Sequence, residues 1–221
     1  MNNSVNGWTI AAGLFVAPFY LALIFILGAL EPGYCHLTKL MSILGGVPGV
    51  RGLTFNIGVI ATGVFLIMFA FGVWRQFPSK ITTKVGFGLL VLGGLGLIGA
   101  GYFHCNEGCR NILAEPDQIG RLHMIMSLLG GVGAGLSPFF VWWAIRGSEK
   151  WKVFVRPTLV AAIFANLPGI LLWITLATGY RLYSVEGLIQ RLGFVVVLIW
   201  IFFFAVRLCR INKQDAHASV L

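Results

Sequence analysis

Side chains that could do chemistry are concentrated in one stretch of this chain, from Tyr102 to Ser127, between long apolar runs. The stretch reads YFHCNEGCRNILAEPDQIGRLHMIMS and contains two of the four histidines, two of the four cysteines and three of the seven acidic residues. Histidine can transfer protons or bind a metal, and an ionisable group inside an apolar segment is costly enough to predict a functional site. This stretch is therefore the first candidate for a binding or catalytic site.

The cysteines of this stretch, Cys105 and Cys109, are separated by three residues. In an oxidising compartment a disulfide is expected, and we favour the pair Cys105–Cys109 over a bridge from Cys35 to either of them. Reduced thiols remain an alternative. A zinc site is another, although C-x3-C matches structural zinc spacings only loosely. Its ligands would come from His36, His104, His123 and the three cysteines.

Metal-dependent hydrolysis is a second chemistry that these side chains could support, with His104, His123 and Asp117 as ligands or base. A haem would need two histidines facing each other from different membrane spans, and only His123 lies within an expected span. No cofactor is therefore expected. Asp117 and Arg121 also fit a purely structural role, because an acid four residues before a base is typical of an ion pair near a helix N-terminus.

The composition predicts the elements that must position these groups. Of 221 residues, 58% are hydrophobic and only 10% are charged, and the mean hydropathy is +0.89. These values are typical of a polytopic membrane protein. Six apolar runs are long enough to cross a bilayer as helices. We therefore expect an all-α bundle of six transmembrane helices in a single integral membrane domain, with spans at about 8–30, 53–74, 81–102, 119–145, 157–179 and 187–208.

The first span is expected to be retained, because the tail before it has no positive n-region and the apolar run is too long for a signal peptide.

The distribution of charged residues among the connections predicts the orientation of the protein in the membrane. One set of connections is strongly basic, with Arg75, Lys80, Lys84, Arg146, Lys150, Lys152, Arg156, Arg207, Arg210 and Lys213 against Glu149 and Asp215. The other set is nearly balanced, with Lys39, Arg51, Arg110, Arg121, Arg181 and Arg191 against Glu31, Glu107, Glu115, Asp117 and Glu186.

The positive-inside rule places the basic set, and with it both termini, in the cytoplasm. The protein is then a multi-pass protein of the cell membrane, and the stretch from Tyr102 to Ser127 faces outward. Orientation and anionic lipid headgroups account for the net charge of +9. No nucleic-acid partner is expected, since short membrane loops offer no groove for one.

Polar groups from different spans are expected at one depth near the outer leaflet. Counting from the span ends places Asn56, His123, Ser127, Gln190 and Arg191 at this level. With Asp117 and Arg121 in the adjoining loop and helix start, they form the predicted ligand-binding set. A purely structural polar network is the alternative.

Packing signals run along the spans. Small residues four apart, such as Ser127, Gly131 and Gly135, or on one face, such as Gly93 and Gly96, predict close helix contacts, with a glycine-lined lipid groove as the alternative. Asn166 and Pro168 predict a kink in the fifth span. In the first outer loop, residues 37–44 have helical spacing of apolar side chains, which predicts a short helix lying on the membrane surface.

Several segments resemble an uncharacterised prokaryotic membrane family, the domain of unknown function 998. They are GYCHLTKLMSILGG, FNIGVIATGVFLIMFAFGVWR, YFHCNEGC, GRLHMIMS and GLIQRLGFVVVLIW, and the resemblance covers about residues 12–207. It implies a small polytopic bundle and no established reaction. The residues matching the family's polar positions are Ser42, Asn56, Cys105, His123 and Arg191. His104 stands where the family would have proline, and Asn106 where it would have aspartate, which weakens a metal site there.

The favoured function is non-enzymatic. We expect a protein that binds a lipid or small apolar ligand, or an accessory subunit, with membrane lipids and other membrane protein subunits as partners. A membrane-embedded metal-dependent hydrolase and a small transporter hinged at Pro168 are the alternatives.

Overall fold

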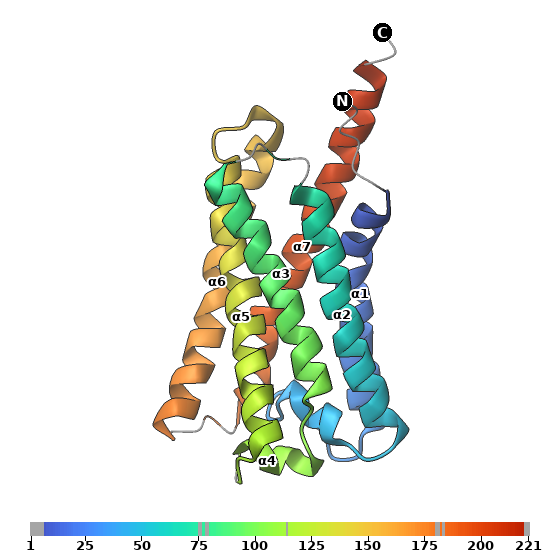
Figure 1. Ribbon diagram of the computed structural model, residues 1–221, viewed down its shortest axis with the longest axis vertical. Helices are drawn as coiled ribbons and strands as arrows, with labels where there is room; N and C mark the ends of the chain where they lie inside the picture. The colour runs from blue at the N-terminus through green and yellow to red at the C-terminus, as the bar shows by residue number, and fades with distance from the viewer. Residues whose placement is uncertain are drawn as a thin grey trace.

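Six long helices form the molecule in the computed structural model, which describes residues 7–74, 77, 80–113, 115–179, 182 and 184–218 (Figure 1). They are α1 (Gly7–Leu30), α2 (Val50–Trp74), α3 (Ile81–Tyr102), α5 (Gln118–Ile145), α6 (Lys152–Thr178) and α7 (Glu186–Ala218). All six are long and apolar enough to cross a membrane. The predicted all-α bundle of six transmembrane helices is confirmed.

Short elements connect the long helices. They are η1 (Met41–Gly46), η2 (Glu107–Cys109), α4 (Arg110–Leu113) and η3 (Glu149–Trp151). Two helices extend beyond their apolar runs: α6 begins at Lys152 rather than at 157, and α7 continues to Ala218 rather than ending at 208. A helix continues into water as long as its backbone hydrogen bonds are made, so the end of an apolar run does not mark the end of a helix.

The helices pack in chain order around a closed ring. Each long helix contacts the next, from α1 through α2, α3, α5 and α6 to α7, and α7 returns to contact α1. The α3–α5 contact is the most extensive of these. It is possible because the backbones meet at glycines: a Cβ on Gly96 would lie 2.2 Å from the backbone nitrogen of Gly130. The small face predicted at Gly93 and Gly96 is therefore a helix contact.

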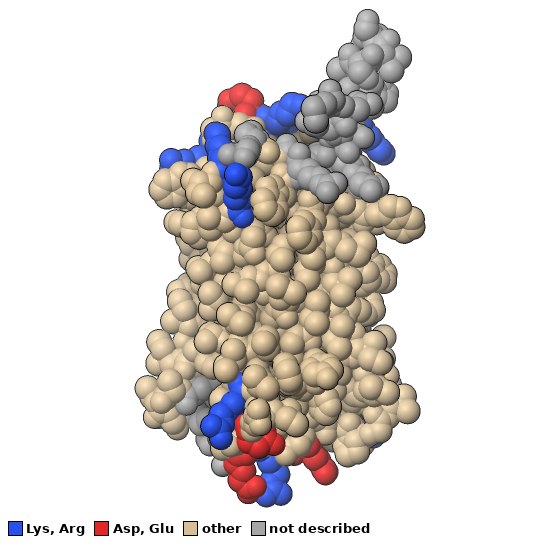
Figure 2. Space-filling model, in the orientation of Figure 1, with Lys and Arg blue, Asp and Glu red and all other residues tan. Residues whose placement is uncertain are grey.

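On the face drawn in Figure 2, the charged side chains of the described residues lie at the two ends of the bundle and not over its middle. One end, where α1 begins and α7 finishes, is mostly basic, while the other carries both signs. Arg75 and Arg181, and the side chain of Asp215, lie outside the described part of the chain. The mixed end holds η1, η2 and α4 (Figure 1).

The first connection at this mixed end, residues 31–49, folds back under the bundle. Its segment η1 contacts α1, α2 and α7, and Met41 and Leu44 are buried. The predicted amphipathic helix on the membrane surface is wrong, because Leu40, Met41 and Leu44 are buried against the bundle and only Leu37 of the four apolar side chains is exposed. We call residues 31–49 the lid, since they close the end of the space between the helices.

Candidate functional site

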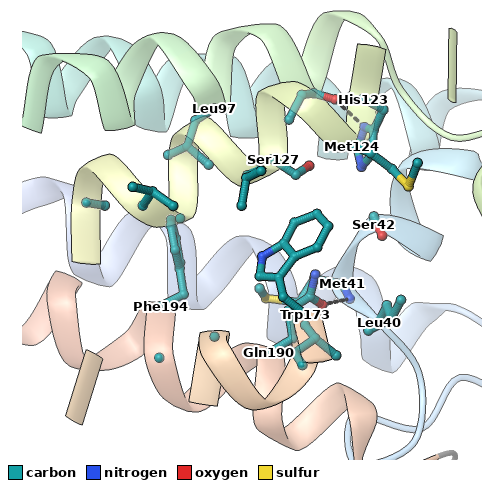
Figure 3. A pocket seen from close by; sticks show the side chains of 18 of the residues that line it. Leu40, Met41, Ser42, Leu97, His123, Met124, Ser127, Trp173, Gln190 and Phe194 are labelled. Atoms are coloured by element: carbon teal, nitrogen blue, oxygen red, sulfur yellow. Dashed lines mark hydrogen bonds between the residues drawn. The ribbon is translucent and has the colours of Figure 1, made fainter. Parts of the chain in front are cut away.

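A cavity of about 1000 Å³ lies above the lid, between α2, α3, α5, α6 and α7 (Figure 3). Most of its wall is apolar, with Leu97, Phe194 and Val197 among the lining residues. The lining residues with polar side-chain groups are Tyr20, Ser42, Asn56, His123, Ser127, Asn166, Trp173 and Gln190. Four of the predicted ligand-binding residues, Asn56, His123, Ser127 and Gln190, thus line one space.

His123 projects from the first turns of α5 into this cavity. Its Nδ1 lies 3.0 Å from the carbonyl oxygen of Ala100 and 2.8 Å from that of Phe103. These carbonyls belong to the C-terminal end of α3, where carbonyl groups have no partner within their own helix. Since both partners only accept, Nδ1 must carry the proton.

The other ring nitrogen of His123, Nε2, is then a hydrogen-bond acceptor. The side chain is only 9% exposed, and no hydrogen bond to Nε2 from any described residue is found. Figure 3 shows this nitrogen directed into the cavity. Because no described side chain donates to Nε2, this atom is free to accept a hydrogen bond from a ligand that carries a donor.

Two amide side chains connect the cavity wall to the lid. The Oε1 atom of Gln190, on α7, accepts a hydrogen bond of 2.6 Å from the backbone N–H of Met41. The Nδ2 atom of Asn56, on α2, donates to the carbonyl oxygen of Gly45 at 2.9 Å. Because the Met41 N–H can only donate, the orientation of the Gln190 amide is fixed, and its NH₂ group remains available as a donor.

Arg191, which was predicted at the same site, does not line the cavity. Its Nη1 donates to the carbonyl oxygens of His36 (2.6 Å), Lys39 (2.9 Å) and Gly187 (2.7 Å), and its Nη2 donates to the Tyr34 hydroxyl. The guanidinium is buried. It fastens the lid to α7, so its role in the structure is to hold the lid.

Tyr34 extends this fastening within the lid. Its hydroxyl accepts from Arg191 and donates to the carbonyl oxygen of Leu40 at 3.2 Å. Burial raises the pKa of the Tyr34 hydroxyl, and the nearby Arg191 cation partly opposes this rise. The hydroxyl therefore keeps its proton at neutral pH and can serve both partners.

Asp117, Arg121 and His104 lie outside the cavity. Asp117 caps α5, accepting a hydrogen bond of 2.6 Å from the backbone N–H of Gly120, and Arg121 is exposed. In the described part of the chain these two side chains form no ion pair. His104 is also exposed, and its Nδ1 lies 2.7 Å from the carbonyl oxygen of Cys105.

The proposed metal ligands do not converge. Among the described residues, no three His, Cys, Asp or Glu side chains lie close enough together to hold a metal ion. Cys105 and Cys109 are paired as a disulfide, and Cys35 and Cys209 are free thiols. The cysteines next to His104 are therefore not thiolate ligands in this structure.

Sequence reasoning missed Trp173, whose indole stands in the cavity between α5 and Gln190 (Figure 3). An aromatic residue in an apolar span gives no sign of whether it faces lipid, core or a cavity.

Gly131 was predicted at a helix contact and this prediction is wrong. It lines the cavity, and a Cβ at this position would meet nothing within 4 Å.

The cavity opens sideways between α5 and α6. Asn166 joins the two helices through its Nδ2, which donates to the carbonyl oxygen of Gly135 at 2.8 Å. Beyond this point, towards the lid, α6 diverges from α5 (Figure 1). Cavity-lining side chains there are also exposed on the outer surface, with exposed fractions of 40% for Leu128 and 54% for Ile174. The opening therefore faces the lipid-contacting side of the bundle.

The fold and the cavity define a class, that of polytopic helical membrane proteins with a laterally open internal cavity. Residues 10–207 match the model of a family described as protein of unknown function (DUF998), and the chain belongs to this family. Neither the curated proteins nor the solved structures gave a match.

Proposed function

We propose that this protein binds a lipid, or another small apolar ligand of similar shape, in the cavity above the lid. The observation that carries this proposal is the combination of an apolar space of about 1000 Å³, a polar end at His123 and Gln190, and a side opening between α5 and α6. This volume is at the upper end of the range for small-molecule sites. A ligand dissolved in the membrane enters such a site without crossing water.

The polar end of the cavity is assigned to the outer leaflet of the cell membrane. The charge distribution supports this assignment, because the opposite end of the bundle is mostly basic (Figure 2) and basic ends favour the cytoplasm. In an oxidising compartment outside the cell, the pair Cys105–Cys109 would remain a disulfide. Membrane lipids are the expected partners, and ligand delivery to another membrane protein subunit is the form of accessory role that fits this site.

The hydrolase alternative is less well supported than binding. Of its three proposed groups, only His123 faces the cavity, while His104 and Asp117 are held at the surface by other contacts. A stoichiometric metal in the purified protein that disappears in His123→Ala would reverse this preference.

The binding proposal is tested by filling the opening. Gly131→Phe adds a ring where a Cβ meets nothing within 4 Å, in the cavity wall of α5. Gly88→Phe is the matched control, because Gly88 on α3 also has free space around its Cβ and does not line the cavity. Native mass spectrometry of the purified proteins should show bound lipid on the wild type and on Gly88→Phe, and none on Gly131→Phe. Equal lipid on all three, or no lipid on the wild type, would contradict the proposal.

A further inference from the structure

The polar end of the cavity carries no charged side chain among the described lining residues. The neighbouring cation, Arg191, directs its Nη groups to the carbonyls of the lid and of Gly187. A phosphate or other anion in the cavity would therefore be buried without a counter-charge, which is strongly unfavourable in a low-dielectric site. The site thus favours an uncharged head group and disfavours a phospholipid.

The remaining hydrogen-bonding capacity defines this head group further. His123 offers an acceptor, Nε2, because its Nδ1 proton is held by the carbonyls of Ala100 and Phe103. Gln190 offers donors, because its Oε1 is occupied by the Met41 N–H. Figure 3 shows these two side chains on different walls of the cavity, His123 on α5 and Gln190 on α7. A complementary ligand has a hydroxyl that donates to one wall and a carbonyl oxygen that accepts from the other.

The apolar part of the ligand can leave the cavity through the side opening between α5 and α6. Asn166 holds α6 to Gly135 of α5 on the side away from the lid, and the exposed lining side chains Leu128, Val132, Ile170 and Ile174 lie along the opening. Acyl chains that leave the cavity between α5 and α6 would remain in contact with membrane lipid. The head group can then stay at the polar end while the chains extend into the bilayer.

Building on the proposed binding function, we infer that the ligand is an uncharged lipid with a free hydroxyl next to a carbonyl, an acylglycerol being the simplest member of this class. Its hydroxyl donates to His123 Nε2, its ester carbonyl accepts from the Gln190 amide, and its chains extend between α5 and α6.

The test compares ligands that differ in one group. Purified full-length protein in detergent micelles is loaded with radiolabelled dioleoylglycerol, and unlabelled competitors are added at equal mole fraction. They are dioleoylglycerol itself, its methyl ether, and dioleoyl phosphatidic acid. The ether keeps the chains and carbonyls but cannot donate, so we expect it to compete about tenfold less well, as one lost hydrogen bond at a buried acceptor implies. Phosphatidic acid should compete more weakly than dioleoylglycerol.

The variant His123→Asn then tests whether His123 Nε2 is the atom that accepts the hydrogen bond from the ligand hydroxyl. In His123→Asn the side-chain amide can still donate to the carbonyls of Ala100 and Phe103 in place of Nδ1, while the acceptor corresponding to Nε2 is removed. We expect dioleoylglycerol to lose about tenfold in affinity and the methyl ether to lose none, so that the two ligands bind alike. Wild-type discrimination between alcohol and ether does not depend on this variant and tests the inference even if the variant fails to fold.

The outcomes separate the two proposals. Competition by phosphatidic acid equal to or better than that of dioleoylglycerol, or equal competition by the ether, overturns the ligand class. If Gly131→Phe also abolishes binding in that case, the binding function stands and only the inference fails. If dioleoylglycerol binding is not saturable, or is unchanged in Gly131→Phe, the inference fails; the proposed function fails with it only if Gly131→Phe also retains the lipid that native mass spectrometry detects on the wild type.

Discussion

The crossing of α3 and α5 leads to an asymmetric prediction for two glycines that face each other. A Cβ on Gly96 would lie 2.2 Å from the backbone nitrogen of Gly130 and 2.7 Å from the carbonyl oxygen of Met126. A Cβ on Gly130 would meet no atom closer than 3.5 Å. Gly96→Ala must therefore push two backbones apart, while Gly130→Ala fits the existing space.

The size of the effect follows from these distances. Restoring ordinary contact at 3.4 Å from 2.2 Å requires the helices to separate by 1.2 Å at the crossing. A gap of 0.5–1 Å already removes a quarter to a half of the dispersion energy of the atoms beside it. We expect Gly96→Ala to be less stable than Gly130→Ala by about 2–3 kcal/mol, towards the upper part of the usual overpacking range. The higher helix propensity of alanine, about 1 kcal/mol, applies to both variants and cancels in the comparison.

Stability is measured by unfolding the purified proteins in mixed micelles with an increasing fraction of sodium dodecyl sulfate, followed by tryptophan fluorescence. Lipid retention is a second readout, because α3 supplies the carbonyls of Ala100 and Phe103 that orient His123. Gly96→Ala should lose bound lipid and Gly130→Ala should keep it. Free energies of unfolding for the two variants within about 0.5 kcal/mol of each other, less than the usual overpacking range, would refute the reasoning.

Three further predictions concern the mixed-charge end of the bundle. Arg191→Lys keeps the charge but loses the planar donors that hold the lid, so trypsin should cleave after Lys39 about tenfold faster or more; unchanged cleavage would contradict this role. Burial, and then the Arg191 cation, lower the pKa of His36, so the unfolded chain takes up a proton at higher pH than the folded protein. Stability should therefore be full above about pH 6.5 and fall as the pH drops through that value; an equal fall in His36→Gln would exclude His36 as the cause. In a background without the two free cysteines, a cysteine replacing Glu115 should react with an impermeant thiol reagent in intact cells, and one replacing Glu149 only after lysis; the reverse pattern would overturn the assigned orientation.

The fold could be predicted from the sequence because apolar runs of spanning length leave few alternatives in a bilayer. The ends of the helices could not, since they depend on local partners. Asp117 is the N-cap of α5, and its side chain accepts a hydrogen bond from the backbone N–H of Gly120. At the other end of the chain, α7 continues beyond its apolar run to Ala218. The sequence places residues 37–44 of the lid on the membrane surface, because their apolar spacing is the same whether they pack on lipid or under a bundle. Only the position of Met41 and Leu44 inside the bundle distinguishes the two.

The depth of the polar residues along their helices could be estimated from the sequence. The side of the helix to which each side chain points could not. Counting from the span ends predicts one depth for Asn56, His123, Ser127 and Gln190, and these four side chains line one cavity. Depth along a helix says nothing about the side to which a residue points, and consecutive residues differ by about 100° around the axis. Arg191 follows Gln190 directly and therefore faces the lid. Its charge suggests a ligand site, but its Nη groups donate to backbone carbonyls and to the Tyr34 hydroxyl.

Gln190 and Arg191 are neighbours on α7 and both bind the lid, which affects the route by which a ligand could reach the cavity. Gln190 accepts from the Met41 N–H, and Arg191 donates to the carbonyls of His36 and Lys39, so the lid is fastened by both backbone donors and backbone acceptors. Moving the lid would break several of these hydrogen bonds, including charged ones worth about 1.5–3 kcal/mol each.

Separating the lid-side halves of α5 and α6 is easier than moving the lid. Within the described residues, the only hydrogen bond between these two helices is that of Asn166 with Gly135, which lies at the other end of the opening. The apolar contacts along the opening can be replaced by lipid chains with little loss, since lipid tails are as apolar as the side chains they replace. The lower barrier is therefore the lateral one, and under the proposed binding function a ligand partitioned into the bilayer would reach His123 without entering water.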